Sequence, residues 1–283
     1  MAINRAQLAK ELEPGLNALF GLEYARYENE AAQIFDNESS DRAFEEEVML
    51  VGFGQANVKA EGAAVGFDTA SESFTARYTH ETIALAFALT EEAVEDNLYD
   101  TLSARYTKAL ARSMAYTKQV RGADVLNTAF ATTGGDGVTL ANTAHPTALG
   151  GTWSNRSATD ADINETSLEQ AMIDIAGFID ERGLKIAMQG RKLIIPVNIQ
   201  FVVDRVLNST LRVGTADNDI NALKNMGMLP GGYTVNHYLT DTDAWFIKTD
   251  CPNGLKHFTR AALATGMEGD FDTGNMRYKA RER

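Results

Sequence analysis

The sequence predicts an α+β fold in which strands and helices occur in unequal blocks. Residues 97–130 have the composition of one very long helix, and residues 48–89 contain two strand-like runs around a soft middle. No internal repeat and no alternation of single strands with single helices is visible, which argues against a parallel α/β sheet. With 283 residues, 44% hydrophobic and 23% charged, the chain can bury a sizeable core.

Composition excludes several classes of protein. The longest apolar run, Thr82–Leu89, is far shorter than the ~20 residues of a membrane span, and the charged N-terminus does not resemble a signal peptide. The single cysteine, Cys251, excludes an internal disulfide and fits a reducing cytoplasm. A net charge of −13 argues against tight wrapping of nucleic acid, although the chain could still enclose it.

The N-terminal region predicts a short amphipathic helix followed by an acidic segment. The helix would end at Pro14-Gly15, with a further turn after it. Six of the twelve residues from Asp36 to Glu47 are acidic, which indicates a solvated linker or helix face, with a calcium site as the alternative. The apolar residues of the helical region lie at helical spacing: Leu8, Leu12, Leu16, Leu19 and Phe20.

Residues 48–89 predict a long two-stranded flap with a middle, 60–73, rich in Gly, Ala and Ser. The apolar residues Phe74, Ala76 and Tyr78 fall at every second position and so lie on one face of a strand. The phase of this alternation changes between His80 and Thr82. A strand that changes its buried face needs a bulge or a strong twist, so we expect the two halves of the flap to pack on different surfaces. The apolar residues after the phase change are Ile83, Leu85, Phe87 and Leu89.

Residues 97–130 predict one helix capped by Asn97. Its apolar residues recur every four positions, so the stripe drifts by about 40° per step and contacts several neighbours in turn. A coiled-coil seam would recur every 3.5 residues, and this one does not. The residues that we expect to form the core of this spine helix are Leu98, Leu102, Tyr106, Leu110 and Met114.

After about thirty residues of little periodicity, the sequence predicts a compact section of helices and strands. One helix would begin at a capping box of Thr166 and Glu169, bury Ile173 and its apolar neighbours, and end at Gly183. The stretch KLIIPVN predicts a buried strand. YTVNHYL and DAWFIKT predict strands around a turn at TDTD, and strands return in the last residues.

Catalytic motifs are weak throughout. GFGQAN (Gly52–Asn57) lacks the third glycine and the following helix of a dinucleotide loop, and DNDIN (Asp217–Asn221) lacks the glycine and glutamate of a calcium loop. The four histidines are scattered, so no two of them have the spacing of metal ligands, and the sequence contains no G-x-S-x-G nucleophile elbow. We therefore predict no catalytic, cofactor-binding or metal residues; a soluble enzyme with an unrecognised site is the alternative from another class.

The order of these parts resembles the tailed-phage major capsid protein family, whose Hong Kong 97-like fold is shared with encapsulins. The resemblance rests on LTEEAVEDNLYDTLSARYTKALARSMAYTKQVRGADVL, which is similar to the family's spine helix and its entry. It also rests on TGGDGVTL, HPT and GGTWSN, and on KLIIPVNIQFVVDRVL, which are similar to stretches after the spine in many phage capsid chains. Together these stretches extend the resemblance over nearly the whole chain.

The resemblance implies a domain organisation. Residues 1–47 would form an N-terminal arm, 48–89 an extended β-hairpin loop, and 90–160 a peripheral domain containing the spine helix. Residues 161–250 would form an axial domain, and 251–283 would return to the peripheral domain as strands. Relatives imply a further segment beyond Arg283, and the absence of a scaffold segment before the arm implies a separate scaffolding protein or none.

The resemblance also implies the function. The chain would be the major capsid protein of a tailed double-stranded DNA bacteriophage, assembling in the host bacterial cytoplasm into the icosahedral shell of the virion. The alternative is an encapsulin-like shell loaded with a cargo enzyme, in which Ala6–Phe20 could serve as the N-terminal helix.

The implied partners are copies of the chain, as hexamers and pentamers, and enclosed double-stranded DNA without sequence-specific contacts. Portal, scaffolding and decoration proteins would be further partners, and no membrane is involved. The family can cross-link through a lysine of the flap, and Lys59 matches it by position only, because no partner Asn or catalytic Glu is identified. The flap residues expected at the intersubunit contact are Lys59, Val65, Phe67, Phe74 and Tyr78.

Overall fold

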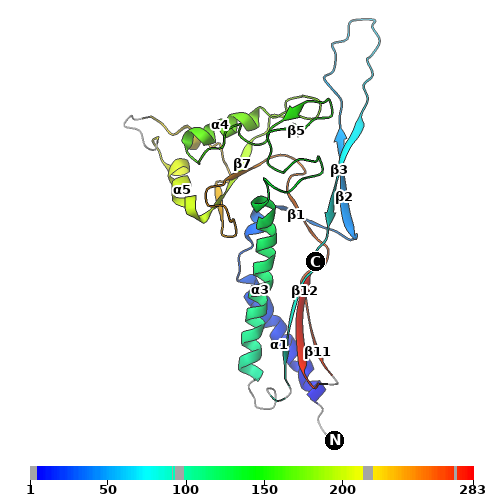
Figure 1. Ribbon diagram of the computed structural model, residues 1–283, viewed down its shortest axis with the longest axis vertical. Helices are drawn as coiled ribbons and strands as arrows, with labels where there is room; N and C mark the ends of the chain where they lie inside the picture. The colour runs from blue at the N-terminus through cyan, green and yellow to red at the C-terminus, as the bar shows by residue number, and fades with distance from the viewer. Residues whose placement is uncertain (1–4, 91, 93–98, 213–218, 271–272) are drawn as a thin grey trace. The chain divides into compact units, whose positions relative to one another are not determined.

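The computed structural model describes residues 5–90, 92, 99–212, 219–270 and 273–283, without the side chains of 5–12 and 99–102. The chain divides into two compact units. The first contains Met1–Ala43, Thr79–Gly122 and Lys256–Arg283, and the second contains Phe44–Tyr78 and Ala123–Leu255. Helices and strands are mixed in both, which confirms the predicted α+β class (Figure 1).

The first unit contains a three-stranded antiparallel sheet. Its strands are β4 (Ile83–Leu89), β11 (Ala264–Gly269) and β12 (Met276–Glu282), with β12 in the centre. Along β12, buried residues alternate with exposed ones, so Tyr278 and Ala280 face the core while Lys279 and Arg281 face solvent. The sheet therefore has one packed and one solvated face.

Two long helices complete the core of this unit: α1 (Arg5–Ala25) and α3 (Tyr99–Asn127). Pro14 lies inside α1 and does not end it, contrary to the sequence prediction. Tertiary packing outweighs the local break, because Leu16 and Phe20 beyond the proline are buried in the shared core. The buried apolar residues of this core are Leu16, Phe20, Leu110, Ala111, Met114, Tyr278 and Ala280.

The chain after α1 packs closely on α3. The short helix η1 (Glu30–Gln33) approaches α3 so closely that a Cβ atom on Gly122 would lie 2.6 Å from the Cβ of Ala31. Gln119 joins the two elements, because its Oε1 accepts from the Ala31 N–H at 3.1 Å and its Nε2 donates to the Asn29 Oδ1 at 3.1 Å. Glycine at position 122 permits this approach.

The acidic segment 36–47 forms strands, contrary to the prediction of a linker or a helix face. It contains β1 (Asp36–Ser39) and the start of β2 (Phe44–Val51). Strand β1 pairs in parallel with β10 (Lys256–Thr259), and Lys256 lies 3.4 Å from the Glu38 carboxylate. The pairing supplies backbone hydrogen bonds, and the cation offsets part of the acidic charge.

The sheet of the second unit has the order β8-β7-β9. The buried strand β7 (Gly190–Pro196) corresponds to the predicted KLIIPVN strand. It pairs in parallel with β8 (Tyr233–Asn236) and antiparallel with β9 (Phe246–Thr249). The predicted strands around TDTD are therefore present, but they do not pair with each other, because β7 lies between them.

Three helices lie with this sheet: α4 (Glu165–Ala176), α5 (Gln200–Asn208), which follows the short η2 (Val197–Ile199), and α6 (Ala222–Met226). The cap of α4 differs from the prediction. Asn164, not Thr166, is the N-cap, its partner in the capping box is Ser167, and the helix ends at Gly177 instead of Gly183. The buried residues of this core are Ile163, Leu168, Met172, Ile175, Leu193, Ile195, Val203, Val206 and Leu223.

Helix α3 lies within the predicted range 97–130, but its stripe is buried only in part. Leu110 and Met114 are 4% and 1% exposed, whereas Tyr106, predicted in the core, is 49% exposed. The drift of a four-residue repeat carries Tyr106 to the margin, where its ring contacts Phe87 at a centroid distance of 5.8 Å. Leu98 and the side chain of Leu102 lie outside the described residues.

Candidate assembly surfaces

The flap is a two-stranded ribbon that ends in a long irregular loop. Strand β2 pairs with β3 (Ser71–Thr79), and residues 52–70 contain no regular secondary structure. Arg77 on β3 binds the Glu46 carboxylate of β2 at 2.6 Å and lies 4.4 Å from the centre of the Phe44 ring. Tyr78 donates to Glu47 at 3.2 Å. These cross-strand pairs stabilise the pairing of the two strands.

The sequence-predicted change of phase in this region has a different cause from the expected bulge. Strand β3 ends at Thr79, and β4, which the prediction places in the same flap, begins at Ile83 and pairs with β12 in the first unit. Phe74, Ala76 and Tyr78 are half-buried on β3. The two halves are therefore separate strands with separate partners, which explains why their buried faces differ.

The tip of the flap exposes large apolar side chains. Phe67 is 101% exposed and Val65 is 66% exposed, and Lys59 is also exposed. Three further residues are exposed in the same way, although their sequence context did not single them out: Phe53 and Val58 on the same loop, and Leu50 near the end of β2. Isolated exposed apolar residues are ordinary, but several on one loop without a core beneath them indicate a binding surface.

The base of the loop is closed by a carboxylate. Asp68 accepts from the Gly54 N–H at 2.7 Å, from the Thr69 N–H at 2.8 Å and from the Arg182 guanidinium at 2.7 Å. The two backbone N–H groups, and then Arg182, lower the pKa of the Asp68 carboxyl. Because Asp68 joins Gly54 across the loop, the segment between them projects from a defined base, while its own side chains stay exposed.

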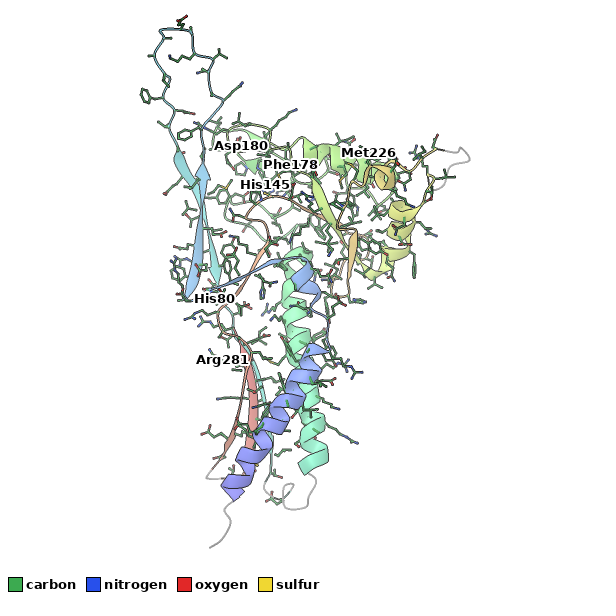
Figure 2. The ribbon with its side chains drawn as sticks, turned by 180° about the vertical axis from the view of Figure 1, so that it is seen from behind. His80, His145, Phe178, Asp180, Met226 and Arg281 are labelled. Carbon is green, nitrogen blue, oxygen red and sulfur yellow. The ribbon has the colours of Figure 1, made fainter. Side chains whose placement is uncertain are left out.

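The glycine-rich stretch after α3 folds around a buried His–Asp pair. His145 on β5 (His145–Pro146) lies with its Nδ1 2.6 Å from Asp136 Oδ2, and both side chains are largely buried. The His145 ring stacks on Trp153 of β6 (Thr152–Trp153) at 4.8 Å, and Trp153 contacts Phe178 at 5.6 Å. His145 and Phe178, which both contact Trp153, are labelled in Figure 2. This cluster gives a structural role to the TGGDG, HPT and GGTWSN stretches.

Three helices of the second unit each expose a large apolar side chain. Ile173, predicted to be buried, is 65% exposed, because α4 turns its Leu168–Met172–Ile175 side to the core instead. Phe201 on α5 and Met226 on α6 are also exposed. Exposed apolar side chains on three successive helices are suited to contacts with another protein surface.

The described residues form no recognisable catalytic centre. No group of three or more of their His, Cys, Asp and Glu side chains could hold a metal ion. The Cys251 side chain is exposed at the surface. Desolvation of its thiol by neighbouring atoms, and then the Asp250 charge, raise the pKa of the thiol, so Cys251 is a weak nucleophile. No helix in the described ranges is long and apolar enough to cross a membrane.

Comparison with known proteins gives one family and a consistent set of folds. Residues 73–283 match the family model described as phage capsid protein. The search of curated proteins finds no match.

Several solved capsid structures share the fold. The procapsid of bacteriophage JBD30 is 14% identical with a TM-score of 0.56, covering 84% of this chain and all of that chain. A chain from the structure of Mycobacterium phage Che8 is 16% identical with a TM-score of 0.52, covering 89% of this chain and 84% of that chain. A virus-like particle from Pyrococcus furiosus is 10% identical with a TM-score of 0.55, covering 95% and 91%. These chains resemble the present one in fold, at low sequence identity.

Proposed function

This chain belongs to the family of phage capsid proteins, and from that premise we propose that it tiles the icosahedral head of a tailed double-stranded DNA bacteriophage. As a major capsid protein it forms the shell from copies of itself. In our proposal these copies are grouped as hexamers and pentamers around the genome. Residues 161–250 act as the axial domain at the centre of each ring, and the flap of each subunit lies on a neighbour.

The exposure of the flap tip carries this proposal. Phe67 is 101% exposed, and Val65 and Val58 are also fully or mostly exposed, so the chain itself provides no core for them. Ordering an irregular loop costs conformational entropy for every residue that is fixed. Burying one Phe side chain contributes about 1.5–3 kcal/mol, which can offset part of that cost when a second subunit covers the loop.

The experiment shortens the flap without disturbing its base. Residues 55–67 are replaced by a short Gly-Ser turn, so that Gly54 and Asp68 keep their hydrogen bond. Because the removed side chains make no core, we expect unchanged circular dichroism and thermal melting of the free subunit. Electron microscopy of the assembly products should then show no closed shells.

A point variant gives the matched control. Phe67→Ser should impair assembly at unchanged subunit stability, whereas Phe67→Tyr keeps the ring and should assemble. Closed shells from the shortened chain would show that the flap is not the intersubunit clasp. Unfolding of the free subunit would be equally damaging, because the flap would then belong to the subunit's own core.

The likeness to the virus-like particle favours a second candidate: an encapsulin-like shell loaded with a cargo enzyme. Both candidates predict closed shells and differ in contents. Particles purified from their natural source would contain double-stranded DNA if the chain is a phage head protein. A second protein in place of nucleic acid would favour the encapsulin-like function.

Portal, scaffolding and decoration proteins are further proposed partners, with assembly in the host bacterial cytoplasm. The proposal of a decoration protein is supported by the likeness to a JBD30 capsid that is decorated with minor capsid protein trimers. Binding of such a protein would be tested on assembled shells, because its site would be built from several subunits.

A further inference from the structure

The described part of α3 has an unusual charge pattern. From Ser103 to Gly122 it contains five cations and no acidic residue. The chain carries 39 acidic residues among 283, which would average about three in a segment of this length. In a chain with a net charge of −13, this helix is a local reversal of sign.

Three of the five cations lie on one exposed face. Lys118 binds Glu282 at 3.2 Å and Arg121 lies 3.5 Å from Glu81, so these two are partly neutralised. Arg105, Lys108 and Arg112 are exposed, and they form no ion pair with another residue in the described ranges. At 100° per residue, positions 105, 108 and 112 fall within about 60° of one another, along about 10 Å of the helix. We call these three residues the basic ridge.

A groove runs beside the ridge within the first unit. Its volume is about 450 Å³, and its lining includes Lys108, Arg112, Tyr116 and Tyr27. The one acidic residue of the lining, Glu23, is buried, accepts from the Tyr27 hydroxyl at 3.4 Å and lies 3.8 Å from Arg26. Its charge is therefore covered, and the groove presents cations flanked by aromatic rings.

We propose that the basic ridge of α3 is a binding surface for the phosphate backbone of double-stranded nucleic acid, and that α3 faces the interior of the shell. The proposal rests on the proposed function, which puts a polyanion inside. Duplex DNA carries one charge per ~1.7 Å of axis, so ~10 Å of axis carries about six phosphates. The three cations of the ridge can contact about three of them without reading bases. The high local concentration of DNA in a closed shell makes weak contacts sufficient.

The acidic segment 36–47 of a neighbouring copy is the competing occupant, and the structure disfavours it. At least three of its six carboxylates have partners in their own chain: Glu38 binds Lys256, Glu46 binds Arg77, and Glu47 accepts from Tyr78. Binding to another subunit's ridge would require those contacts to break. Binding to DNA phosphates breaks no contact within the chain, and release of the condensed counterions of the DNA favours it at low salt.

The test measures binding of a fluorescent mixed-sequence duplex to the unassembled full-length chain by anisotropy, over a series of salt concentrations. The ridge variant is Lys108→Gln with Arg112→Gln. Its control is Lys279→Gln with Arg281→Gln, which removes the same charge from the solvated face of the sheet in the same unit. Three phosphate contacts predict a slope of log affinity against log salt of about −2.7, and the ridge variant should lose about 1.8 of it.

We expect the ridge variant to bind the duplex at least tenfold more weakly at about 50 mM salt, and the control to stay within about twofold of the parent. If both variants lost the same affinity for the duplex, net charge alone would explain binding and the proposal would be overturned. Loss of affinity in the control alone would overturn it too. A ridge variant that keeps the duplex but loses a labelled peptide of residues 36–47, or fails to form shells, would make the ridge a protein interface. If the unmodified chain forms no shells, the proposed function fails independently of the duplex result.

Discussion

Gly122→Ala is the most discriminating test of how α3 packs. Its local effect on helix propensity stabilises the folded chain, whereas its tertiary effect on packing destabilises it. In a helix interior, replacing glycine by alanine stabilises by about 1 kcal/mol. Here the new Cβ would lie 2.6 Å from the Cβ of Ala31, which is buried. Carbon atoms pack at about 3.5–4.0 Å, so η1 would have to move by about 1 Å.

The cost of that movement outweighs the gain. Overpacking of this kind costs about 1–3 kcal/mol, and the shift also stretches the Gln119–Ala31 hydrogen bond, worth about 1 kcal/mol. After the gain in helix propensity, we expect Gly122→Ala to lower the free energy of unfolding by about 1–3 kcal/mol. The assay is urea denaturation of free full-length subunits, followed by circular dichroism.

Two further variants make the reasoning refutable. A Cβ added to Gly21 in α1 would meet no atom within 4 Å, so Gly21→Ala should stabilise by about 1 kcal/mol. Adding Ala31→Gly to Gly122→Ala removes the clashing atom and should restore most of the lost stability. If Gly122→Ala is as stable as the parent, or Ala31→Gly gives no rescue, the close approach of η1 and α3 is wrong.

Three other predictions concern two buried side chains, Leu110 and His145, and the half-buried His257. Leu110→Ala should destabilise free subunits by about 2–5 kcal/mol in chemical denaturation, because the side chain is 4% exposed, and an unchanged midpoint would place it outside the core. His145→Ala removes the partner of Asp136 Oδ2 and should lower the free energy of unfolding by about 2–3 kcal/mol. Denaturation followed by tryptophan fluorescence measures this, and an unaltered transition would contradict the role of the pair. Burial, and then the Lys118 charge, lower the pKa of His257 below its ordinary 6.5. Protonation therefore favours the unfolded chain, so stability should be complete above pH 6.5 and fall as the pH drops toward the lowered pKa; His257→Gln should flatten this loss, and identical profiles would refute it.

Patterns with a strong period could be read from the sequence. The four-residue stripe of the spine and the apolar KLIIPVN run each predict an element that the structure contains. Tyr106 shows the limit of such reasoning, since a drifting stripe does not reveal which of its members meets a neighbour. Pro14 shows another limit. Helix α1 continues past this proline because it packs against α3 and β12, which are distant in sequence.

Pairing between elements could not be predicted. The change of phase near His80 was visible, but two strands with separate partners and one bulged strand give the same alternation. Likewise, β7 lies between β8 and β9 in the sheet, and the sequence of the TDTD turn does not indicate that another strand separates the two. The Asp136–His145 pair depends on the path of an irregular loop, for which sequence offers no period.

The basic ridge has a signal in the sequence itself. Five cations without an acid over twenty helical residues can be counted there directly. What sequence could not supply is the knowledge that two of them are paired and three are exposed on one face.

A cryo-electron microscopy reconstruction of the particles formed by the full-length chain tests the central claim most directly. We predict a closed shell in which the flap tip of each subunit is ordered and Phe67 is buried against a neighbouring subunit. A closed shell with Phe67 still in solvent, or small open oligomers in place of shells, would contradict it.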